Sequence, residues 1–304
     1  MNTKYLICIV GPTAIGKTAL SIALAKYYKT EIISADSRQF YKEMNIGTAV
    51  PSVEELKQVK HHFIQNRSIQ DDYNVGAFEK DALSCIQRLF KKHDTLILVG
   101  GSGLYIDAVT EGLDEFPKID PEVRKSLNKQ LIEEGLESLQ NRLKQLDPIG
   151  FELIAIDNPH RVIRALEVSI GSGRPYSSYL STSKKERSFK VIIIGLDAER
   201  TIIYDRINAR VDLMMSAGLL SEAERLKPFK HLNALNTVGY KELFNYLENK
   251  WTLEFAVAEI KKNSRRFAKR QLTWFKKNTT IKWFNYLSAV NDIIHYIEDK
   301  KKPR

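Results

Sequence analysis

The sequence contains very little cysteine. Only Cys8 and Cys85 are present, one in a short apolar run and the other in a helical pattern. Two thiols so far apart give neither a disulfide framework nor a zinc site, so we expect a reducing compartment. There is also no signal-peptide layout and no apolar run long enough to span a bilayer. We therefore expect a cytoplasmic protein with no membrane partner.

The composition is that of a globular protein with a basic excess. Of 304 residues, 43% are hydrophobic and 28% charged, which suits one large or two modest domains. Lys and Arg number 47 against 37 Asp and Glu, for a net charge of +10. This excess suggests a polyanionic partner, although charge alone does not identify it.

Short apolar runs bounded by turn residues recur along the chain. They lie at residues 5–10, 31–35, 95–101 and 190–196 and alternate with helical segments. Continuous apolar runs in such an order are typical of strands buried on both faces of a parallel sheet. The sequence therefore predicts an α/β fold.

Between about residues 115 and 189 the strand-like runs are replaced by polar helical segments. One helix is predicted to begin with Asp120 as N-cap and Pro121 at the first helical position. A second begins at the DNPHRV segment and is expected to end with Gly171 in the left-handed conformation. We predict a catalytic core of residues 1–114 and 190–304, interrupted by a helical insertion domain at 115–189.

The first predicted strand is followed by the sequence GPTAIGKT and then by a helical segment. This is the P-loop pattern shared with ATP-binding proteins, in which backbone N–H groups and a helix N-terminus surround a phosphate. Lys17 adds a point charge, and the Thr18 hydroxyl is placed to bind Mg2+. The predicted diphosphate or triphosphate site comprises Gly11, Pro12, Thr13, Ala14, Ile15, Gly16, Lys17 and Thr18.

The residues after the other strands are less decisive. The run TLILV is followed by GGSG instead of a magnesium-binding Asp, which disfavours an NTPase more than a small-molecule kinase. Asp36 follows a predicted strand at the ligand-binding edge of the sheet. Its carboxylate could act as a general base or could cap a loop, and the sequence leaves both interpretations open. Ser102 offers a hydroxyl at the same edge, but a G-G-S-G turn alone is a weak signal.

Residues 261–277 carry eight Lys or Arg and no acid. A helical wheel places one apolar arc against one basic arc. A basic arc without acids favours contacts with a nucleic-acid backbone over a solvated face or a membrane-surface helix. A second basic cluster lies at residues 160–164. The apolar arc comprises Phe267, Ala268, Leu272, Trp274 and Phe275, and the basic arc Lys262, Arg265, Arg266, Lys269, Arg270, Lys276 and Lys277.

Other polar residues, taken alone, predict structural or surface roles and no chemistry. Adjacent His61 and His62 would point to opposite faces of a strand and make a poor metal pair, which favours hydrogen-bonding roles. Arg210, one charge on an amphipathic helix, reads as a surface residue.

Taken together, these motifs resemble those of one family, the tRNA dimethylallyltransferases or tRNA isopentenyltransferases, in their bacterial type. The likeness covers nearly the whole chain, in family order, through GPTAIGKT, SADSRQFY, MNIGTAVP, HHFI, YNVGAF, LVGGSGLY, HRVIRALEV, RVDLMMSAGL, TVGYKEL and RRFAKRQLTWF. The resemblance implies a P-loop kinase-like core with a helical insertion. It also implies transfer of a dimethylallyl group from dimethylallyl diphosphate to the exocyclic amine of the adenosine immediately 3′ of the anticodon.

The resemblance also implies roles for residues. The P-loop, Lys17, Mg2+ near Thr18, and Arg210 would hold the departing diphosphate, while Asp36 would accept a proton from the amine or orient it. Ser102 completes the implied catalytic set. The tRNA anticodon stem-loop would contact Asp36, Ser37, Arg38, Gln39, Ser102, Arg124, His160, Arg161, Val162, Ile163, Arg164, Asn236, Thr237, Val238, Gly239, Tyr240, Lys241, Lys269, Arg270, Gln271, Leu272, Thr273, Trp274, Phe275 and Lys276.

Three positions depart from the common family form: Ser102 replaces Thr, Val50 replaces Lys, and Gln65 replaces an acid. Rival interpretations are an adenylate isopentenyltransferase acting on free nucleotides, a P-loop small-molecule kinase, and a non-catalytic RNA-binding module. We expect a monomer.

Overall fold

The computed structural model describes residues 3–181 and 185–302. The chain divides into two compact units. Unit 1 comprises Met1–Glu111 with Glu186–Arg304, and unit 2 comprises Gly112–Lys185. Each unit is described by itself below.

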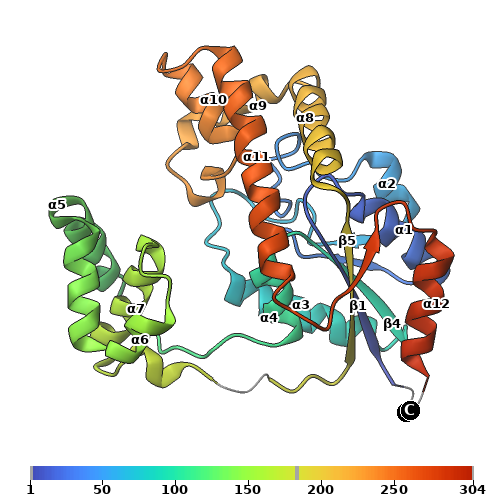
Figure 1. Cartoon of the computed structure of the whole chain (residues 1–304), viewed down its shortest axis with the longest axis horizontal. Helices are drawn as coiled ribbons and strands as arrows, with labels where there is room; N and C mark the ends of the chain where they lie inside the picture. Colours follow the sequence, from blue (N-terminus) through green and yellow to red (C-terminus); the bar gives the residue numbers. More distant parts are fainter. Residues whose placement is uncertain (1–2, 182–184, 303–304) are drawn as a thin grey trace. The chain divides into compact units, whose positions relative to one another are not determined.

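Unit 1 is built on a parallel sheet (Figure 1). In the described residues it has six strands in the order β3-β2-β4-β1-β5-β6, and every pairing is parallel. The predicted α/β fold is confirmed, and the edge strands β3 and β6 were not predicted. The strands are β1 (Tyr5–Val10), β2 (Ile32–Ser34), β3 (His61–His62), β4 (Thr95–Val99), β5 (Lys190–Asp197) and β6 (Lys282–Asn285).

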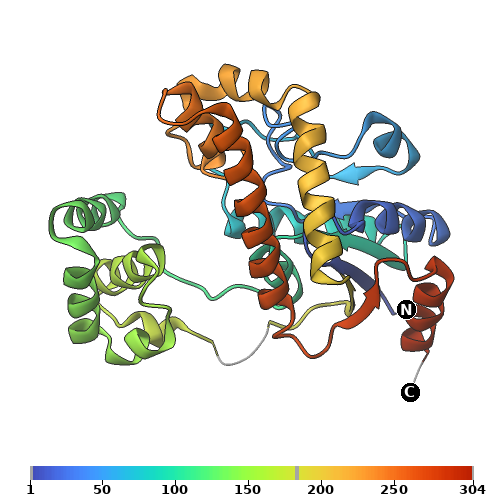
Figure 2. The same cartoon turned by 45° about the horizontal axis from the view of Figure 1, so that its top comes forward.

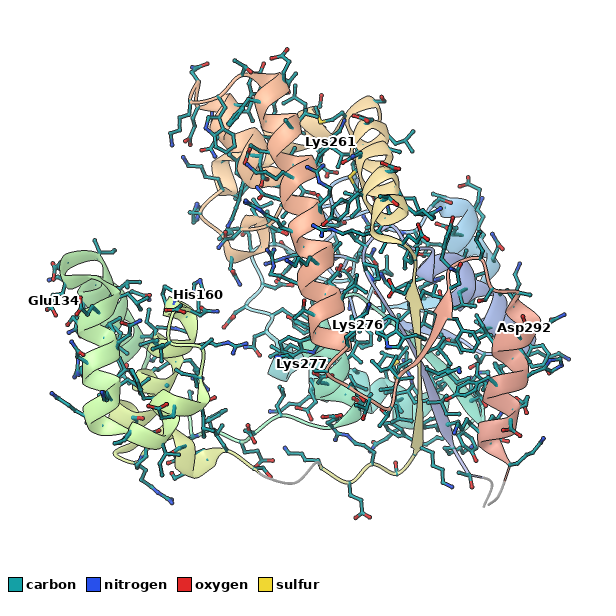
Figure 3. All side chains as sticks on the ribbon, viewed as in Figure 1. Glu134, His160, Lys261, Lys276, Lys277 and Asp292 are labelled. Carbon is teal, nitrogen blue, oxygen red and sulfur yellow. The ribbon has the colours of Figure 1, made fainter. Side chains whose placement is uncertain are left out.

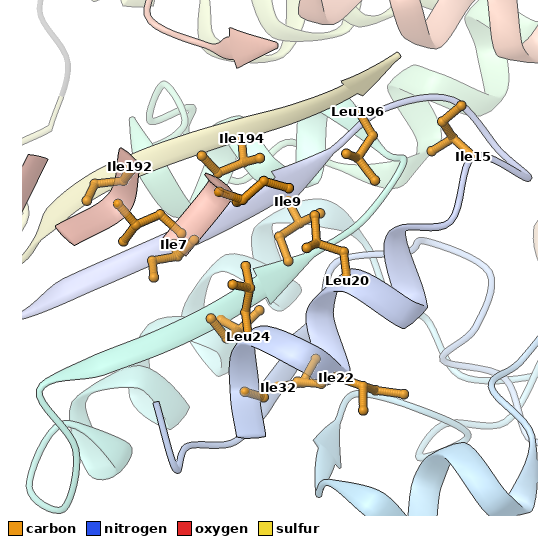
Figure 4. Packing of buried hydrophobic residues seen from close by; sticks show 14 of the residues in the cluster. Ile7, Ile9, Ile15, Leu20, Ile22, Leu24, Ile32, Ile192, Ile194 and Leu196 are labelled. Carbon is orange, nitrogen blue, oxygen red and sulfur yellow. The ribbon is translucent and has the colours of Figure 1, made fainter. Parts of the chain in front are cut away.

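Apolar side chains cover both faces of this sheet. On β1, Ile7 and Ile9 join the cluster under helices α1 and α12, whereas Leu6 and Cys8 join the cluster under α3 and α4. Figure 4 shows Leu20 and Leu24 of α1 packed towards the first face. Burial on both faces explains why the strands read as unbroken apolar runs. These helices are α1 (Lys17–Tyr27), α3 (Val75–Leu89), α4 (Gly103–Thr110) and α12 (Val290–Lys301).

Further helices of unit 1 form a layer with its own core around the buried Tyr240. Helices α8 and α11 lie side by side in this layer (Figure 2). The remaining elements of unit 1 are α2 (Val53–Gln58), α8 (Arg200–Ser216), α9 (Leu219–Leu226), η2 (Lys227–Phe229), η3 (Asn233–Leu235), α10 (Tyr240–Leu247) and α11 (Leu253–Phe275).

Unit 2 is helical in its described residues. Asp120 caps the first helix by accepting a hydrogen bond from the N–H of Glu122, with Pro121 at the first position, as predicted. The second long helix ends at Gly173, which has φ +71°, so the prediction of Gly171 as the left-handed cap was wrong. Gly171 lies inside that helix against Ile119. The elements are α5 (Pro121–Leu146, with non-helical Gly135), α6 (Pro148–Leu153), α7 (Pro159–Ser172) and η1 (Tyr176–Tyr179).

No helix among the described residues combines the length and apolar character needed to cross a membrane. Both cysteines are free thiols and are buried.

Candidate active site

The P-loop connects β1 to α1 at the carboxyl edge of the sheet. Gly11 has φ +142°, and a Cβ there would lie 2.6 Å from the carbonyl oxygen of Leu196. Gly16 is the N-cap of α1 in a left-handed conformation, and no side chain caps the helix. Both glycines are therefore required by the backbone path, and the first turn of α1, which no side chain caps, leaves N–H groups available to an anion.

Lys17 turns back over this loop. Its ammonium donates hydrogen bonds to the carbonyl oxygens of Gly11 at 3.0 Å and Pro12 at 2.7 Å. Burial lowers the pKa of Lys17 to about 8, opposed by the charge of Asp36 and assisted by that of Arg210. A bound anion would favour the charged ammonium.

Two arginines of α8 reach the same loop. The guanidinium of Arg210 donates to the Thr13 hydroxyl at 3.5 Å, and that of Arg206 donates from Nε to the carbonyl of Ala14 at 2.8 Å. Burial lowers the pKa of Arg210, and the neighbouring charge of Arg206 acts in the same direction. Arg210 thus belongs to the site and is not an isolated surface charge. The sequence reasoning missed Arg206, although its spacing of four from Arg210 on one helix could have indicated it.

Asp36 follows β2 and lies beside the P-loop. Its Oδ1 accepts a hydrogen bond from the N–H of Arg38 at 3.0 Å, the capping contact that the sequence left open. Its Oδ2 makes no hydrogen bond within residues 3–181 and 185–302. One carboxylate oxygen is thus fixed while Asp36 also lines a pocket, so a cap and a base role are compatible here.

Ser102 ties the turn after β4 to the segment after Asp36. Its hydroxyl accepts from the N–H of Ser37 at 3.1 Å and donates to the Ser37 hydroxyl, also at 3.1 Å. Gly100 allows the two segments to approach, since a Cβ there would lie 2.5 Å from the carbonyl of Ala35.

Two pockets adjoin at these residues, one of about 540 Å³ over the P-loop and one of about 550 Å³ reaching towards α10. Each has the size of a small-ligand site. The P-loop pocket is also lined by Val50, the position where the common family form has Lys. Seven residues line both pockets: Thr13, Asp36, Thr48, Ala49, Arg210, Met214 and Phe267.

The buried carboxylate of Glu222 holds the segment that forms part of both pockets. It accepts hydrogen bonds from the N–H groups of Asn45, Ile46 and Gly47, at 2.9 to 3.1 Å, and from the Tyr240 hydroxyl at 2.7 Å. A buried carboxylate with several donors is a stable arrangement. Sequence reasoning missed Glu222, which is one of two acids on its helix.

Most of the segment 236–241 lines the larger pocket, as do Arg38 and Arg270. Tyr240 is the exception, because its side chain is buried below the pocket. Gln39 donates to the carbonyls of Thr48 and Ala49, at 3.2 and 3.0 Å. Gln65 donates to the side chain of Asn45 at 3.3 Å.

Helix α11 differs from the predicted two arcs. Ala268 and Phe275 are buried and Leu272 is half-buried, as expected of the apolar arc, but Phe267 and Trp274 are 39% and 38% exposed. The buried polar residue of this stretch is Gln271, at 6% exposure. An idealised wheel missed this because a polar side chain with partners can be buried. Figure 3 shows Lys276 and Lys277 at the end of α11. The exposed basic residues are Arg266, Lys269, Arg270, Lys276 and Lys277, beside exposed Thr273.

Unit 2 carries the second basic cluster on α5 and α7. His160, labelled in Figure 3, and Arg161 are exposed, as is Arg124. Glu167 lies between two guanidinium groups, 3.0 Å from that of Arg164 and 3.8 Å from that of Arg124. Buried in the unit 2 core are the side chains of Val162 and Ile163.

The adjacent histidines make separate contacts. His61 bonds to the carbonyl of Val59 at 2.8 Å, and His62 bonds to Glu31 at 2.7 Å. The described residues contain no group of three or more His, Cys, Asp or Glu side chains able to hold a metal ion.

A glycine-rich loop between a strand and a helix, at the carboxyl edge of a parallel sheet, defines a P-loop protein of kinase-like fold. The model of the family described as IPP transferase matches residues 39–278, and the chain belongs to this family. It is 60% identical over 305 residues to the tRNA dimethylallyltransferase of Flavobacterium johnsoniae, covering 98% of this chain and 99% of that one.

Two solved structures are similar to this one. The full-length tRNA isopentenylpyrophosphate transferase from Bacillus halodurans has a TM-score of 0.74 and 36% identity, over 98% of this chain and 97% of that chain. A eukaryotic dimethylallyltransferase acting on tRNA has a TM-score of 0.81 at 24% identity, over 99% and 81% of the two chains, which shows the shared fold. The family predicted from the motifs is confirmed.

Proposed function

We propose that the protein transfers a dimethylallyl group from dimethylallyl diphosphate to the exocyclic amine of the adenosine immediately 3′ of the anticodon in tRNA, and releases diphosphate. One observation carries the proposal. Asp36 borders both the P-loop pocket and the larger pocket, so a carboxylate lies where a donor held by the P-loop would meet an acceptor base.

The P-loop would hold the diphosphate as a leaving group. In the reaction the bond between the allylic carbon and the diphosphate oxygen breaks, and a bond from the amine nitrogen to that carbon forms. Negative charge builds on the departing oxygen, and the α1 N–H groups, Lys17 and Arg210 are placed to stabilise it. No phosphoryl group is transferred, which distinguishes this reaction from that of a kinase.

Asp36 would orient the adenine amine and accept its proton after the nitrogen is alkylated. An adenine amine is a weak nucleophile, so its position against the allylic carbon matters at least as much as proton removal. Oδ2 of Asp36, which has no hydrogen-bond partner in the described part of the chain, is the oxygen available for this contact. The target base must leave the anticodon-loop stack to reach it.

We propose Mg2+ as the metal. Thr18 offers a hydroxyl on the P-loop pocket, and the described residues form no carboxylate cluster of their own, which suits a cation brought mainly by the diphosphate oxygens. When bound, the ion would neutralise charge on the diphosphate.

The exposed basic residues of α11 and the Arg124, His160, Arg161 and Arg164 cluster of unit 2 are proposed to bind the phosphate backbone of the anticodon stem-loop. Because Val162, Ile163, Tyr240 and Phe275 are buried, any contact they make with tRNA goes through the backbone. We further propose that the protein is monomeric and works in the cytoplasm, where its two buried thiols stay reduced.

The decisive experiment incubates the protein with dimethylallyl diphosphate, Mg2+ and unmodified tRNA, followed by nucleoside analysis of the digested RNA. We expect isopentenyladenosine and one equivalent of diphosphate. Product from free adenosine monophosphate but not from tRNA would support an adenylate isopentenyltransferase acting on free nucleotides instead. Transfer of label from the γ-phosphate of ATP to a small molecule would support a kinase.

A further inference from the structure

We propose, on the basis of the function above, that Gln271 is a positioning residue. It sets the spacing between the P-loop and the carboxylate of Asp36. The resemblance placed Gln271 among the tRNA contacts. The residue is only 6% exposed, and its side chain bonds to the P-loop, whose pocket it lines.

Both ends of the Gln271 amide are used. Its Oε1 accepts a hydrogen bond from the N–H of Thr13 in the P-loop at 2.9 Å, and its Nε2 donates to the carbonyl of Gly101 at 2.9 Å. One side chain therefore joins the turn after β1 to the turn after β4. A glutamine suits this place because it carries a donor and an acceptor on one planar group.

The contact with Gly101 continues to Asp36. The next residue, Ser102, bonds through its hydroxyl to the N–H and the hydroxyl of Ser37. A continuous series of hydrogen bonds and peptide bonds thus runs from Thr13 through Gln271, Gly101 and Ser102 to the residue that follows Asp36.

The neighbouring backbone is shaped around this amide. A Cβ at Gly101 would lie 2.2 Å from Nε2 of Gln271 and 3.8 Å from Nζ of Lys17. A Cβ at this second glycine of the G-G-S-G turn would therefore displace the Gln271 amide from its hydrogen-bonded position, beside Lys17. The sequence alone indicates only that such turns often contain glycine.

The helix that carries Gln271 is firmly seated at this turn. One turn before, Ala268 is buried, and one turn after, Phe275 is buried. The indole N–H of Trp274 donates to the Asp107 carboxylate of α4 at 2.8 Å, and a Cβ at Gly103 would lie 2.3 Å from the Trp274 ring. Gln271 is thus presented from a fixed helix, and it can set the relative position of two turns.

This position matters for transfer because the allylic carbon must lie in line between the leaving oxygen and the attacking nitrogen. A displacement of about 1 Å can cost about 10²-fold in rate without loss of binding. We therefore expect Gln271 to act on kcat, whereas the charges of the P-loop and of α11 still bind their substrates.

The test is prenyl transfer by Gln271→Leu, which keeps the approximate volume and removes both hydrogen bonds. We expect kcat to fall by about 10²-fold. The dissociation constants of inorganic diphosphate and of the anticodon stem-loop should change much less than kcat. A kcat within about twofold of the unmodified protein would overturn the proposal, because that change is well below the expected effect.

A second variant separates positioning from simple structural support. In Gln271→Glu an ionised carboxylate can accept from Thr13 but cannot donate to Gly101, whereas a protonated carboxyl can do both. The kcat of this variant, relative to the unmodified protein, should rise as the pH is lowered, and that of Gln271→Leu should not. A flat ratio for the glutamate variant contradicts the proposal, and this variant alone decides if the leucine variant does not fold.

Gln140→Leu is the matched control. Gln140 of unit 2 also donates to a backbone carbonyl, that of Ile156 at 3.0 Å, and belongs to no part of the site. Its loss should leave kcat unchanged. Failure of the proposed function is recognised separately, because the unmodified protein would then give no prenylated nucleoside at all.

Discussion

The backbone N–H of Ser37 donates a hydrogen bond to the hydroxyl of Ser102 at 3.1 Å. This contact holds the residue next to Asp36 against the turn that follows β4. Since Oδ1 of Asp36 is also fixed by the N–H of Arg38, the carboxylate has little freedom, and Asp36 lines both pockets. A preorganised carboxylate of this kind is suited to position an amine.

Replacing Asp36 separates chemistry from binding. Asp36→Ala should lower the single-turnover rate of prenyl transfer by about 10²- to 10⁴-fold, the range of a lost acid–base group. The affinity for tRNA, measured by filter binding, should stay nearly intact. Asp36→Asn is the control for loop structure, because its amide oxygen can still accept from Arg38. A large loss of tRNA affinity in both variants would assign Asp36 to binding instead.

The pH dependence of diphosphate binding should report on Lys17. Burial holds its pKa at about 8 in the free protein. A bound anion favours the ammonium and raises that pKa, so binding takes up a proton when the pH exceeds the free-state value. Affinity for inorganic diphosphate should therefore weaken as the pH rises above this value, by up to about tenfold per pH unit. Calorimetry in buffers of different ionisation enthalpy measures both effects.

Lys17→Met is the reference for that titration. It should bind diphosphate more weakly and lose the extra proton uptake, so the difference between the two proteins isolates the lysine from the titration of diphosphate itself. Equal pH dependence in both proteins would show that Lys17 stays charged throughout.

Charge reversal on α11 should affect the RNA and not the donor. Arg266→Glu with Arg270→Glu should weaken binding of the anticodon stem-loop and lower the slope of log affinity against log salt by about one for each lost phosphate contact. Diphosphate affinity should not change. Lys91→Glu with Lys92→Glu makes the same charge change at exposed positions after α3, and should leave both affinities nearly unchanged. Equal losses in the two double variants would mean that only net charge matters.

The buried hydrogen bond from Tyr240 to Glu222 should contribute to stability. Tyr240→Phe removes one of the four donors to a carboxylate that is 2% exposed, and hydrogen bonds to charged groups contribute about 1.5 to 3 kcal/mol. Urea unfolding should show a free energy of unfolding that is lower by this amount. Tyr27→Phe, at an exposed tyrosine, is the control and should have almost no effect. A loss no larger than that of the control would contradict a structural role for the hydroxyl.

The central strands were predictable because parallel strands covered on both faces must be apolar along their whole length, as in residues 5–10. The P-loop was predictable because its glycines and lysine are local in sequence. Edge strand β6, the run KWFN, escaped prediction because it is short and only partly buried.

The parts of the site that depend on distant contacts could not be predicted from local patterns. Nothing local to Gln271 indicates that its amide meets Thr13, and the helical wheel assigned Phe267 and Trp274 to a buried face that is in fact partly exposed. Gly173, and not Gly171, ends its helix because the helix continues two residues further than the glycine pattern suggested.

The partner of Thr13 lies 258 positions further along the chain. During synthesis on the ribosome the loop emerges early, but the glutamine that fixes it emerges only when the polypeptide is nearly finished. A prematurely terminated product that ends before α11 would retain the glycines and the lysine and still lack the correct alignment. Incomplete chains would therefore transfer the prenyl group slowly, even where they fold in part.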